Sequence, residues 1–373
     1  MIVHLIRDDK FIDSALREFE RSAPGENRAV LLADPKPLTY VSSSVSFMNE
    51  AQAISIINEA DAVVCHGLIK RFYPVLEKLP EATPVAWLGW GFDYYSALLA
   101  PAFPNGLLQP QTRCLVEEAK PKKGRAHRLS RVLKRLVDRS GEVDRRRAKI
   151  VSRINFFSPV LEAEYDLAVS CMPDFSPAYI PWNYGVAEDD FALGVSTALG
   201  GDILVGNSAT PENNHIEVFA FLAEHFDLAD RRVIVPLSYG KKWYRDRVVE
   251  DGYRIFGDKF FPLLDFLPKQ DYLQLMDSCG YVFMNHIRQQ AVGNILIALL
   301  KGARVFINKD NPCHEWLSRE GAVFSSIDAD MEVDLVPLLE YEKQANSEMV
   351  YRCWGRDVQR MKTDNLVAEL LSV

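Results

Sequence analysis

The sequence alternates short apolar runs with helical patterns, and this alternation constrains the fold more than any other feature. In the first half, IVHLI, RAVLLA, AVVCHG and PVAWLG have strand composition, and amphipathic segments such as IDSALREFERSA separate them. In the second half, the strand-like runs are DILVG, RRVIVPL, YVFMN and ARVFI, again separated by helical segments. Strands that alternate with helices form parallel sheets covered by helices. We therefore predict an α/β protein built from doubly wound sheets.

The length of the chain predicts two domains. A single hydrophobic core rarely serves more than about 250 to 300 residues, and this chain has 373. The stretch MPDFSPAYIPWNYG is rich in Pro and aromatic residues, which is typical of a loop between domains. We predict an N-terminal domain over residues 1–180 and a C-terminal domain over 181–345. A last helical segment, 346–373, is expected to return to the N-terminal domain.

Composition indicates a folded, cytoplasmic protein. Hydrophobic residues make up 48% of the chain and charged residues 25%, which is ordinary for a globular protein. The apolar run before Arg7 is too short for a signal peptide, and no stretch approaches the roughly 20 apolar residues that span a bilayer. The six cysteines include no CxxC pair, so we expect neither a disulfide framework nor a zinc site.

One basic segment, residues 120–153, stands out in an acidic chain. It holds 14 Lys and Arg against three acidic residues, whereas the whole chain has a formal net charge of −8. Within it, RLSRVLKRLVDR has the spacing of a basic amphipathic helix. Such a helix binds an anionic membrane surface, or it packs its apolar side on its own domain. We expect peripheral contact with the inner face of the cell inner membrane, and no nucleic-acid partner because the rest of the chain is acidic.

Three loops in the second half follow predicted strands and precede predicted helices, where doubly wound sheets bind ligands. The first, GNSATPENNH, covers residues 206–215 and combines a glycine turn with hydroxyl and amide groups beside a helix N-terminus, where exposed NH groups favour phosphate. Thr210 followed by Pro211 also explains part of this motif as a helix cap. Because capping does not need Asn207 or Ser208, we predict phosphate or sugar binding here.

The other two loops add positive charge. The loop PLSYGKKWY, residues 236–244, presents Lys241 after Gly240, and a lysine there can neutralise a diphosphate leaving group. The loop NHIRQQAVGN, residues 285–294, offers Arg288, whose guanidinium can bind two phosphate oxygens at once. The histidine of this loop fits a ligand contact and a backbone-satisfied core position equally well. Together these loops predict an anion site.

In the first half, WLGWGFDYY places Trp90, Asp93 and Tyr94 after a predicted strand. An aromatic platform with one carboxylate suits a sugar or a hydroxyl acceptor, and Asp93 is a candidate general base for an inverting reaction. An aromatic core with a capping Asp explains the same residues equally well. Weaker candidates lie at comparable strand ends, namely Asp8, Asp9 and His66.

The sequence gives no sign of a metal site. The only suggestive pattern is the DAD at residues 328–330, and no His or second carboxylate cluster supports it. A solvated loop is the simpler interpretation, so we expect no metal and no other cofactor.

Taken in order, the second-half loops resemble a known enzyme family. GNSATPENNH, VPLSYG, DFLPKQDYLQLMDSC and MNHIRQQAVGNILIALLKGARVFINKDNP resemble the TDP-N-acetylfucosamine:lipid II N-acetylfucosaminyltransferases, also called 4-alpha-L-fucosyltransferases. The resemblance is strong over residues 200–315, whereas the first half matches only in DDKF, HGL and GWGFD. It implies a GT-B glycosyltransferase, with two Rossmann-like domains that face each other across a cleft.

The resemblance also implies the substrates of a cell-surface polysaccharide synthesis: a TDP-sugar bound by the C-terminal, nucleotide-sugar-binding domain, and a lipid-linked saccharide acceptor, at the membrane, bound by the N-terminal, acceptor-binding domain. We assign catalytic roles to Asp93, Arg288 and Lys241. Donor-binding roles are assigned to residues of the three loops: Gly206, Asn207, Ser208, Asn214, His215, Tyr239, Gly240, His286, Gln289, Gln290, Gly293 and Asn294.

The ribose contact departs from the general GT-B pattern. Many such enzymes hold the ribose with a Glu in the last donor helix, but counting back from Gly302 puts Ile297 at that place. The contact must then come from elsewhere, such as Asn294 or Gln290, which is consistent with a deoxyribose donor. Two alternatives stay open: a GT-B enzyme that uses a UDP- or GDP-sugar for capsule or exopolysaccharide assembly, and a non-catalytic, membrane-docked binding subunit.

Overall fold

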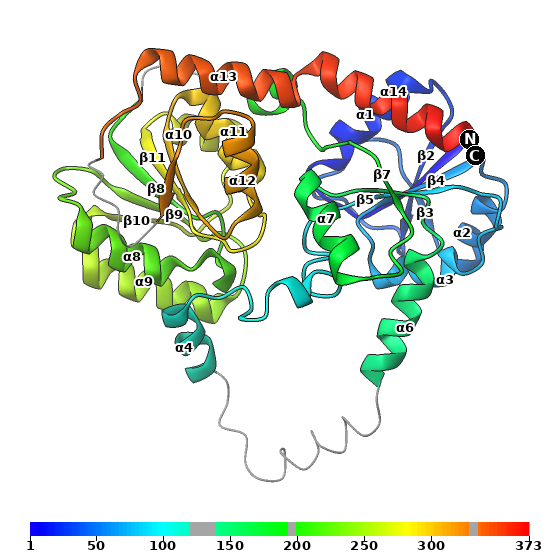
Figure 1. Ribbon diagram of the computed structural model, residues 1–373, viewed down its shortest axis with the longest axis horizontal. Coiled ribbons are helices and arrows are strands. Elements are labelled where there is room, and N and C mark those ends of the chain that lie inside the picture. Colours follow the sequence, from blue (N-terminus) through cyan, green and yellow to red (C-terminus); the bar gives the residue numbers. More distant parts are fainter. Residues whose placement is uncertain (120–138, 193–198, 328–334, 373) are drawn as a thin grey trace, which may run out of the picture. The chain divides into compact units, whose positions relative to one another are not determined.

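The computed structural model describes residues 1–119, 139–192, 199–327 and 335–372. The chain forms two compact units (Figure 1). Unit 1 comprises residues 1–104, 121–185 and 357–373, and unit 2 comprises residues 105–120 and 186–356. Residues 105–120, which the sequence placed in the N-terminal domain, therefore lie in unit 2. The chain enters unit 1 for the last time after residue 356, whereas the sequence prediction placed this boundary after residue 345.

Unit 1 contains a seven-stranded sheet in the order β3-β2-β1-β4-β5-β6-β7, in which every pair is parallel. Its central strands are fully buried, as expected of a parallel sheet covered on both faces. The strands are β1 (Ile2–Ile6), β2 (Asn27–Leu32), β3 (Ser46–Met48), β4 (Ala62–His66), β5 (Val85–Leu88), β6 (Phe156–Ser158) and β7 (Ala178–Tyr179).

Helices cover this sheet, and the C-terminal helix completes the core. Leu366 and Leu370 of that helix pack with Ile2 and Val64 in one buried cluster, and Trp182 Nε1 donates to Thr363 Oγ1 at 3.0 Å. The helices are α1 (Ile12–Ser22), α2 (Glu50–Ile57), α3 (Tyr73–Leu76), α6 (Arg139–Val151), α7 (Glu162–Cys171) and α14 (Arg356–Ser372), with 3₁₀ turns η1 (Lys70–Phe72) and η2 (Ala100–Ala102).

Unit 2 contains a six-stranded parallel sheet in the order β10-β9-β8-β11-β12-β13. The strands are β8 (Asp202–Val205), β9 (Val233–Pro236), β10 (Phe260–Leu263), β11 (Cys279–Met284), β12 (Arg304–Asn308) and β13 (Ser325–Ile327). The helices are α4 (Pro110–Glu118), α8 (His215–His225), α9 (Lys242–Phe256), α10 (Lys269–Met276), α11 (Val292–Lys301), α12 (Pro312–Arg319) and α13 (Glu340–Trp354), with short turns η3 (Ala187–Phe191), η4 (Pro211–Asn213) and η5 (Gly257–Lys259).

The core of unit 2 centres on β11, all of whose residues are buried. Phe283 of β11 stacks on Phe306 of β12 with ring centroids 4.2 Å apart and an interplanar angle of 4°. The helix α11 is apolar on nearly every side and is buried from Ile295 to Lys301. Both units thus have the doubly wound parallel architecture that the alternation of strands and helices predicted, and the α/β prediction is confirmed.

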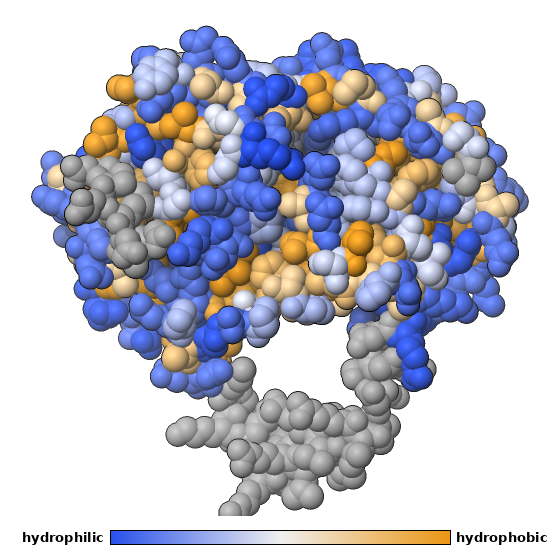
Figure 2. Space-filling view, in the orientation of Figure 1, coloured by the Kyte–Doolittle hydropathy of each residue, from blue (hydrophilic) through white to orange (hydrophobic). Residues whose placement is uncertain are grey.

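The basic segment predicted to form an amphipathic helix falls mostly on residues 120–138, which lie outside the described part of the chain. Its described end packs on unit 1. Arg146 pairs with Glu77 at 2.7 Å, and Arg153 donates to the Pro80 carbonyl at 2.8 Å. Within the described ranges, no helix has the length and apolarity to cross a bilayer. On the face seen in Figure 2, hydrophobic residues are interspersed with hydrophilic ones.

The contribution of α14 to the core of unit 1 can be tested with two leucines of that helix. Leu366 is fully buried, whereas Leu371 is 50% exposed. We expect Leu366→Ala to lower the free energy of unfolding by about 2 to 5 kcal/mol, because it removes buried methyl groups and leaves a cavity. Leu371→Ala should change it by less than about 0.5 kcal/mol. Urea unfolding measures both, and equal effects would show that α14 does not close the core.

Candidate functional site

The sheet of unit 2 has a topological switch point between β8 and β11. From β8 the chain continues to β9 on one side, whereas β11 lies on the other side of β8 and leads to β12. The loops that leave such a pair at their carboxyl ends diverge, and ligands of open α/β sheets bind in the crevice between them. Here these are the loops after Val205 and after Met284, two of the three loops singled out in the sequence.

Asn213 organises this switch point. Its Oδ1 accepts hydrogen bonds from the Asn207 backbone N at 2.8 Å and from His286 Nε2 at 3.0 Å, and its Nδ2 donates to Ser208 Oγ at 3.1 Å and Thr210 Oγ1 at 2.8 Å. One buried amide therefore joins the loop after β8 to the loop after β11. Asn213 is not among the site residues predicted above, because the sequence does not show which Asn of the NN pair points inward.

The conformation of Gly206 is required by this arrangement. Its φ is +66°, and a Cβ atom there would lie 2.6 Å from Asn213 Oδ1 and 2.8 Å from His215 Nε2. Only glycine adopts this backbone conformation at no steric cost and also leaves room for both side chains. Gly206 thus shapes the site through its missing side chain.

Three helices begin near these loops without a side-chain cap. The N-cap residues are Asn214 for α8, Lys241 for α9 and Ala291 for α11, and none of their side chains accepts a hydrogen bond from the helix. In contrast, α12 is capped by Asn311, whose side chain accepts from the Cys313 backbone. Uncapped first-turn NH groups carry the positive end of the helix dipole and bind anions.

Ala291 has a left-handed conformation just before α11, with φ +60°. For a non-glycine residue this conformation costs about 1 kcal/mol or more, and such strain concentrates at ligand-binding sites. The strain and the missing cap occur at the same residue, next to Gly293 and Asn294, which are both half-buried. The conformation at the start of α11 therefore does not maximise helix stability, which is typical of a ligand-binding position.

His286 is a neutral ring with one unused acceptor. Its Nε2 faces two acceptor oxygens, Asn213 Oδ1 at 3.0 Å and Asn207 Oδ1 at 3.2 Å, so this nitrogen carries the proton. Burial, helped by the nearby Arg288 charge, lowers the His286 pKa well below its usual value, which keeps the ring neutral. Its Nδ1 is then a bare lone pair, buried and without a partner among the described residues.

Two further polar atoms beside His286 lack partners in the described part of the chain. His215 Nε2 and Gln290 Oε1 are both buried and accept or donate no hydrogen bond. The Gln290 amide is oriented by its Nε2, which donates to Asn207 Oδ1 at 2.9 Å, so its free oxygen is an acceptor. Buried polar atoms without partners are rare, and a cluster of them indicates a place where a ligand or water completes the hydrogen bonding.

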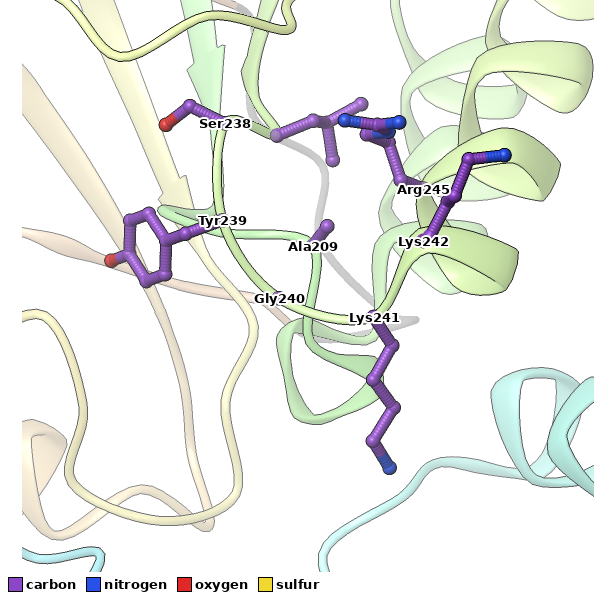
Figure 3. A pocket seen from close by; sticks show the side chains of 8 residues that line it. Ala209, Ser238, Tyr239, Gly240, Lys241, Lys242 and Arg245 are labelled. Atoms are coloured by element: carbon purple, nitrogen blue, oxygen red, sulfur yellow. The ribbon is translucent and has the colours of Figure 1, made fainter.

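The loops after β8 and β9 meet at a backbone bridge between Ala209 and Gly240. Ala209 N donates to the Tyr239 carbonyl at 2.7 Å, and Lys241 N donates to the Ala209 carbonyl at 2.8 Å. A pocket of about 200 Å³ lies there, lined by Ala209, Leu237, Ser238, Tyr239, Gly240, Lys241, Lys242 and Arg245. Figure 3 shows that Lys241 points away from Arg245, so the cations of this pocket do not all converge on one point.

The structure changes the role of Arg288. Its Nε donates to Glu212 Oε2 at 2.7 Å and its Nη1 to the Gln289 carbonyl at 2.9 Å. Only 14% of its side chain is exposed. A guanidinium already paired with a carboxylate is a weaker diphosphate partner than the sequence suggested, because its charge is partly neutralised. Arg288 instead ties the loop after β11 to η4.

Asn214 and Asn285 also serve the structure rather than a ligand. Asn214 Oδ1 accepts from Gln109 N at 2.9 Å, and its Nδ2 donates to the Asn285 carbonyl at 3.0 Å. Asn285 Nδ2 donates to Gln109 Oε1 at 3.0 Å. These bonds hold the start of α4 on unit 2, together with the bond from Thr112 N to Glu217 Oε1 at 2.8 Å. Nothing in the sequence pattern pointed to Gln109.

The predicted donor residues thus separate into two groups. Some are buried: Gly206, Ser208, Asn214, His215, His286 and Gln289. Others are at least partly accessible at the strand ends, as is Lys241, which was predicted to be catalytic: Asn207, Tyr239, Gly240, Gln290, Gly293 and Asn294. Tyr239 is 49% exposed, and its hydroxyl accepts from Asn207 Nδ2 at 3.1 Å.

In unit 1, Asp93 is fully engaged by the protein itself. Its carboxylate accepts from Leu68 N at 2.8 Å, Trp87 Nε1 at 2.6 Å and Trp90 N at 2.9 Å, and it is 5% exposed. Burial raises the Asp93 pKa, while these three donors lower it. A carboxylate buried beneath three NH donors is poorly placed to take a proton from a substrate. The contacts favour the interpretation of Asp93 as a structural residue in an aromatic core.

A buried hydrogen-bond chain lies beside Asp93, and its proton positions can be assigned. Asn27 Nδ2 donates to the Ala23 carbonyl at 2.6 Å, so Asn27 Oδ1 must accept from His4 Nε2, 3.1 Å away. His4 Nδ1 then accepts from His66 Nε2 at 3.1 Å, and His66 Nδ1 accepts from the Tyr184 hydroxyl at 2.9 Å. Tyr184 in turn accepts from Trp90 Nε1 at 2.7 Å. Every member is satisfied when both histidines are neutral.

No metal centre emerges from the described residues, which contain no group of three or more His, Cys, Asp or Glu placed to hold an ion. The DAD pattern at 328–330 lies outside the described ranges. The expectation of a metal-independent protein without cofactors stays a prediction.

Solved structures with the same arrangement identify the fold as GT-B. HepE from Anabaena, solved with UDP and glucose, aligns over 100% of this chain and 99% of its own, with a TM-score of 0.61 at 13% identity. A glycosyltransferase from Rickettsia africae aligns over 99% and 98%, with a TM-score of 0.60 at 10% identity. Sucrose-phosphate synthase from Thermosynechococcus elongatus aligns over 100% and 99%, with a TM-score of 0.60 at 8% identity.

These likenesses show the fold, and the sequence of unit 2 shows the activity. Residues 193–350 match the model of a glycosyltransferase family. The protein is therefore a glycosyltransferase of the GT-B type. The matching model is that of the 4-alpha-L-fucosyltransferases, glycosyl transferase group 56, which is the family that the loops resemble.

The close approach of the loops after β8 and β9 can be tested with two glycines. Gly240 has φ +125°, and a Cβ atom there would lie 2.4 Å from the Ala209 backbone, whereas Gly257 has φ +55° with nothing within 4 Å. Both alanine variants strain the backbone, by about 1 to 3 kcal/mol. We expect only Gly240→Ala also to break the Ala209–Gly240 bridge, and so to lower the melting temperature further. Equal melting temperatures would contradict this account.

The buried histidines of unit 1 predict a pH dependence. Burial lowers the His4 pKa to about 4, against 6.5 for an unperturbed histidine. Between about pH 6.5 and pH 4, His4 is protonated in the unfolded chain but not in the folded chain. The free energy of unfolding therefore has its full value above about pH 6.5 and decreases as the pH falls toward 4. We expect His4→Asn to reduce the slope of stability against pH by about 1.4 kcal/mol per pH unit in that window. Urea unfolding at pH 7, 6 and 5 measures it.

A histidine on the surface provides the control for this experiment. His225 is exposed at the end of α8, so His225→Asn should leave the slope unchanged. If His4→Asn and His225→Asn behaved alike, the His4–His66 chain would not govern the acid sensitivity of unit 1.

Proposed function

We propose that the protein transfers a deoxy or amino sugar, such as fucose or N-acetylfucosamine, from a TDP-sugar to a lipid-linked saccharide in cell-surface polysaccharide synthesis. The observation that carries the donor assignment is the switch point of unit 2. There, uncapped helix starts and unpartnered acceptor atoms lie at the ends of two neighbouring strands. The first feature suits phosphate oxygens and the second suits hydroxyl groups.

Positive charge without a competing carboxylate supports the diphosphate part of this proposal. Within the described residues, the Lys241 ammonium has no ion-pair partner, whereas Arg245, which lines the same pocket, lies 3.6 Å from Asp246 Oδ1. As the bond between sugar and phosphate breaks, negative charge grows on the leaving diphosphate. Preorganised donors and cations that face this charge lower the barrier. We assign this role to Lys241 and the first turn of α11 in preference to Arg288, which Glu212 already neutralises.

The choice of TDP rests on the composition of α11. This helix, VGNILIALLK, contains no carboxylate, and Ile297 is buried at 7% exposure. A carboxylate there would pair with the two hydroxyl groups of a ribose, and a 2′-deoxyribose offers only one. The bare acceptors His286 Nδ1 and Gln290 Oε1 can each receive one hydroxyl, from the sugar or the deoxyribose.

A UDP donor is the second candidate. HepE, which shares the fold, was solved with UDP and glucose, and the same anion site would accept any nucleoside diphosphate. The family match favours fucose-type sugars. The nucleoside, through its base and its 2′-hydroxyl group, therefore decides between the two candidates, and the transferred sugar does not.

The acceptor side of the proposal rests on charge. The basic segment 120–153 would attract an anionic membrane surface, each cation near the headgroups adding about 1 kcal/mol. A polyprenyl-diphosphate carrier presents its saccharide at such a surface. We propose peripheral association with the inner face of the cell membrane through the part of this segment before α6, because Arg146 and Arg153 are bound to unit 1.

A thermal-shift experiment tests the donor proposal. We expect TDP at 100 times its Kd to raise the free energy of unfolding by about 2.7 kcal/mol. UDP or GDP at the same concentration should raise it less. Lys241→Ala should weaken TDP binding by about 10- to 150-fold, since a hydrogen bond to a charged group contributes about 1.5 to 3 kcal/mol. Lys259→Ala is the matched control, because Lys259 lies in η5, before β10, at the opposite edge of the sheet.

The outcomes separate the candidates. Greater stabilisation by UDP or GDP would replace the TDP assignment and keep the site. No stabilisation by any of the three, with no hydrolysis of a sugar nucleotide, would show that unit 2 has lost donor binding and would favour a non-catalytic subunit.

A further inference from the structure

One part of unit 2 reaches its strand ends from outside the family-matched sequence. Residues 105–118 belong to unit 2 and end in α4, which lies beside α8 (Figure 1). The family match covers residues 193–350, so it does not include them. We call residues 105–118 the strap. The hydrogen bonds of the strap show which loops of unit 2 it holds.

The strap contacts the strand ends of unit 2 through Gln109. This residue is the N-cap of α4, but its side chain accepts no hydrogen bond from that helix. Its amide contacts Asn285 instead: Gln109 Nε2 donates to Asn285 Oδ1 at 3.2 Å, and Asn285 Nδ2 donates to Gln109 Oε1 at 3.0 Å. In addition, Gln109 N donates to Asn214 Oδ1 at 2.9 Å. One residue of the strap therefore binds both the loop after β11 and the N-cap residue of α8.

A backbone carbonyl fixes the orientation of both amides. The Asn214 carbonyl lies 3.3 Å from Asn285 Nδ2, and because a carbonyl only accepts, the atom that faces it is the nitrogen. Asn285 Oδ1 then faces Gln109 Nε2, and it also accepts from Asn308 Nδ2 at 2.8 Å. All four hydrogen-bonding positions of the Asn285 amide are thus filled. Two of the four partner atoms belong to Gln109.

The position of Asn285 therefore depends on the strap. Asn285 is 1% exposed. If the Gln109 amide is removed, one donor position and one acceptor position of Asn285 lose their partners. A buried polar group without a partner is costly, so Asn285 rotates toward other groups or admits water. In either case the strap no longer holds it in one place.

His286 follows Asn285 directly and is held from two directions. Its Nε2 donates to side-chain oxygens of Asn213 and Asn207, which belong to the loop after β8. Its backbone is joined to Asn285, which the strap holds. These two attachments set the direction of the Nδ1 lone pair, which is buried without a partner in the described part of the chain. Because hydrogen bonds weaken steeply when they bend, that direction decides which ligand group the lone pair can accept from.

We propose that Gln109 is a positioning residue of the donor site. It holds Asn285, and through Asn285 it holds His286, so that His286 Nδ1 accepts from a hydroxyl group of the sugar nucleotide. Gln109 itself does not touch the ligand. This inference rests on the proposed function, which supplies the ligand of His286. It also means that the family-matched residues 193–350 do not form the donor site alone.

The test compares Gln109→Ala with two control variants of the same helix, in the full chain. Leu115 packs against the core of unit 2, so Leu115→Ala loosens α4 without removing a bond to Asn285. Gln111 is exposed in the first turn, so Gln111→Ala controls for the loss of an amide. The probe is N-acetylfucosamine linked to whichever of TDP, UDP or GDP stabilises the wild type most. Its Kd and the melting temperature are measured on the same samples.

We expect Gln109→Ala to raise the Kd of the sugar nucleotide about fivefold, which corresponds to one neutral hydrogen bond of about 1 kcal/mol. Leu115→Ala should lower the melting temperature because it removes apolar contact with the core. Its Kd should stay within about twofold of the wild type, since sites without shared partners act almost independently. Gln111→Ala should change neither quantity. In a purely structural role, the Kd would instead follow the melting temperature in every variant.

A second measurement observes His286 itself. The chain has seven histidines, and the His286 ring nitrogens are assigned in protein with ¹⁵N-labelled histidine by comparison with His286→Asn. In the wild type, the Nδ1 resonance should shift when the sugar nucleotide is added, because this bare nitrogen then receives a hydrogen bond. We expect Gln109→Ala to lose most of this shift, whereas Leu115→Ala and Gln111→Ala should retain it.

Gln109→Glu covers the case in which the alanine variant fails to fold. Glutamate has the same length as glutamine, and its carboxylate still accepts from Asn285 Nδ2. It cannot donate to Asn285 Oδ1, so two acceptor oxygens face each other at that point. We expect this variant to show the same rise in Kd and the same loss of the Nδ1 shift.

Two results would overturn the proposal. One is a wild-type Kd and a wild-type Nδ1 shift in the Gln109 variants that fold. The other is a rise in Kd for Leu115→Ala as large as that for Gln109→Ala, which would show that any loosening of α4 has the same effect. Both differ from a failure of the proposed function itself, in which the wild type would bind no sugar nucleotide and its His286 resonances would not respond.

Discussion

Every strand in both sheets runs parallel to its neighbours, and the rest of the molecule depends on this constraint. Parallel strands bring all their carboxyl ends to one edge, so the loops that follow them are gathered there whatever their separation in sequence. The backbone groups at that edge need partners, and the protein supplies them with short polar side chains such as Asn213 in unit 2 and Asp93 in unit 1. The polar groups that remain unpaired after this are the ones a ligand can use.

Much of the architecture could be predicted from the sequence because it depends on local pattern. Runs such as YVFMN are buried on both faces and read as central strands, and the glycines at 206 and 240 mark turns that only glycine fits closely. The family resemblance of the loops was confirmed over residues 193–350. The pattern could not show which of several similar side chains already has hydrogen-bond or ion-pair partners within the protein.

The site residues illustrate this limit. Asp93 and Asp9 both follow strands, but the donors that occupy Asp93 come from Leu68, Trp87 and Trp90, which only the fold brings together. The sequence predicts Arg288 to be an unpaired cation, but in the structure Glu212 of η4 forms an ion pair with it. Asn213 and Asn214 are adjacent in sequence, but Asn214 has a left-handed conformation and the two side chains have different partners. Asn213 accepts from Asn207 N, whereas Asn214 accepts from Gln109 N. Sequence separation hides such pairings, because they arise from tertiary packing.

Residues 105–120 have a consequence for how such a protein can evolve. The chain passes between the two units four times, and α4 belongs to unit 2 although it is encoded ahead of much of unit 1. Without residues 105–120, Asn214 and Asn285 would each lose Gln109 as a partner, and Glu217 would lose Thr112. Neither unit therefore corresponds to one uninterrupted stretch of the gene. Recombination that exchanges one unit for a relative's would therefore have to replace several separated stretches at once.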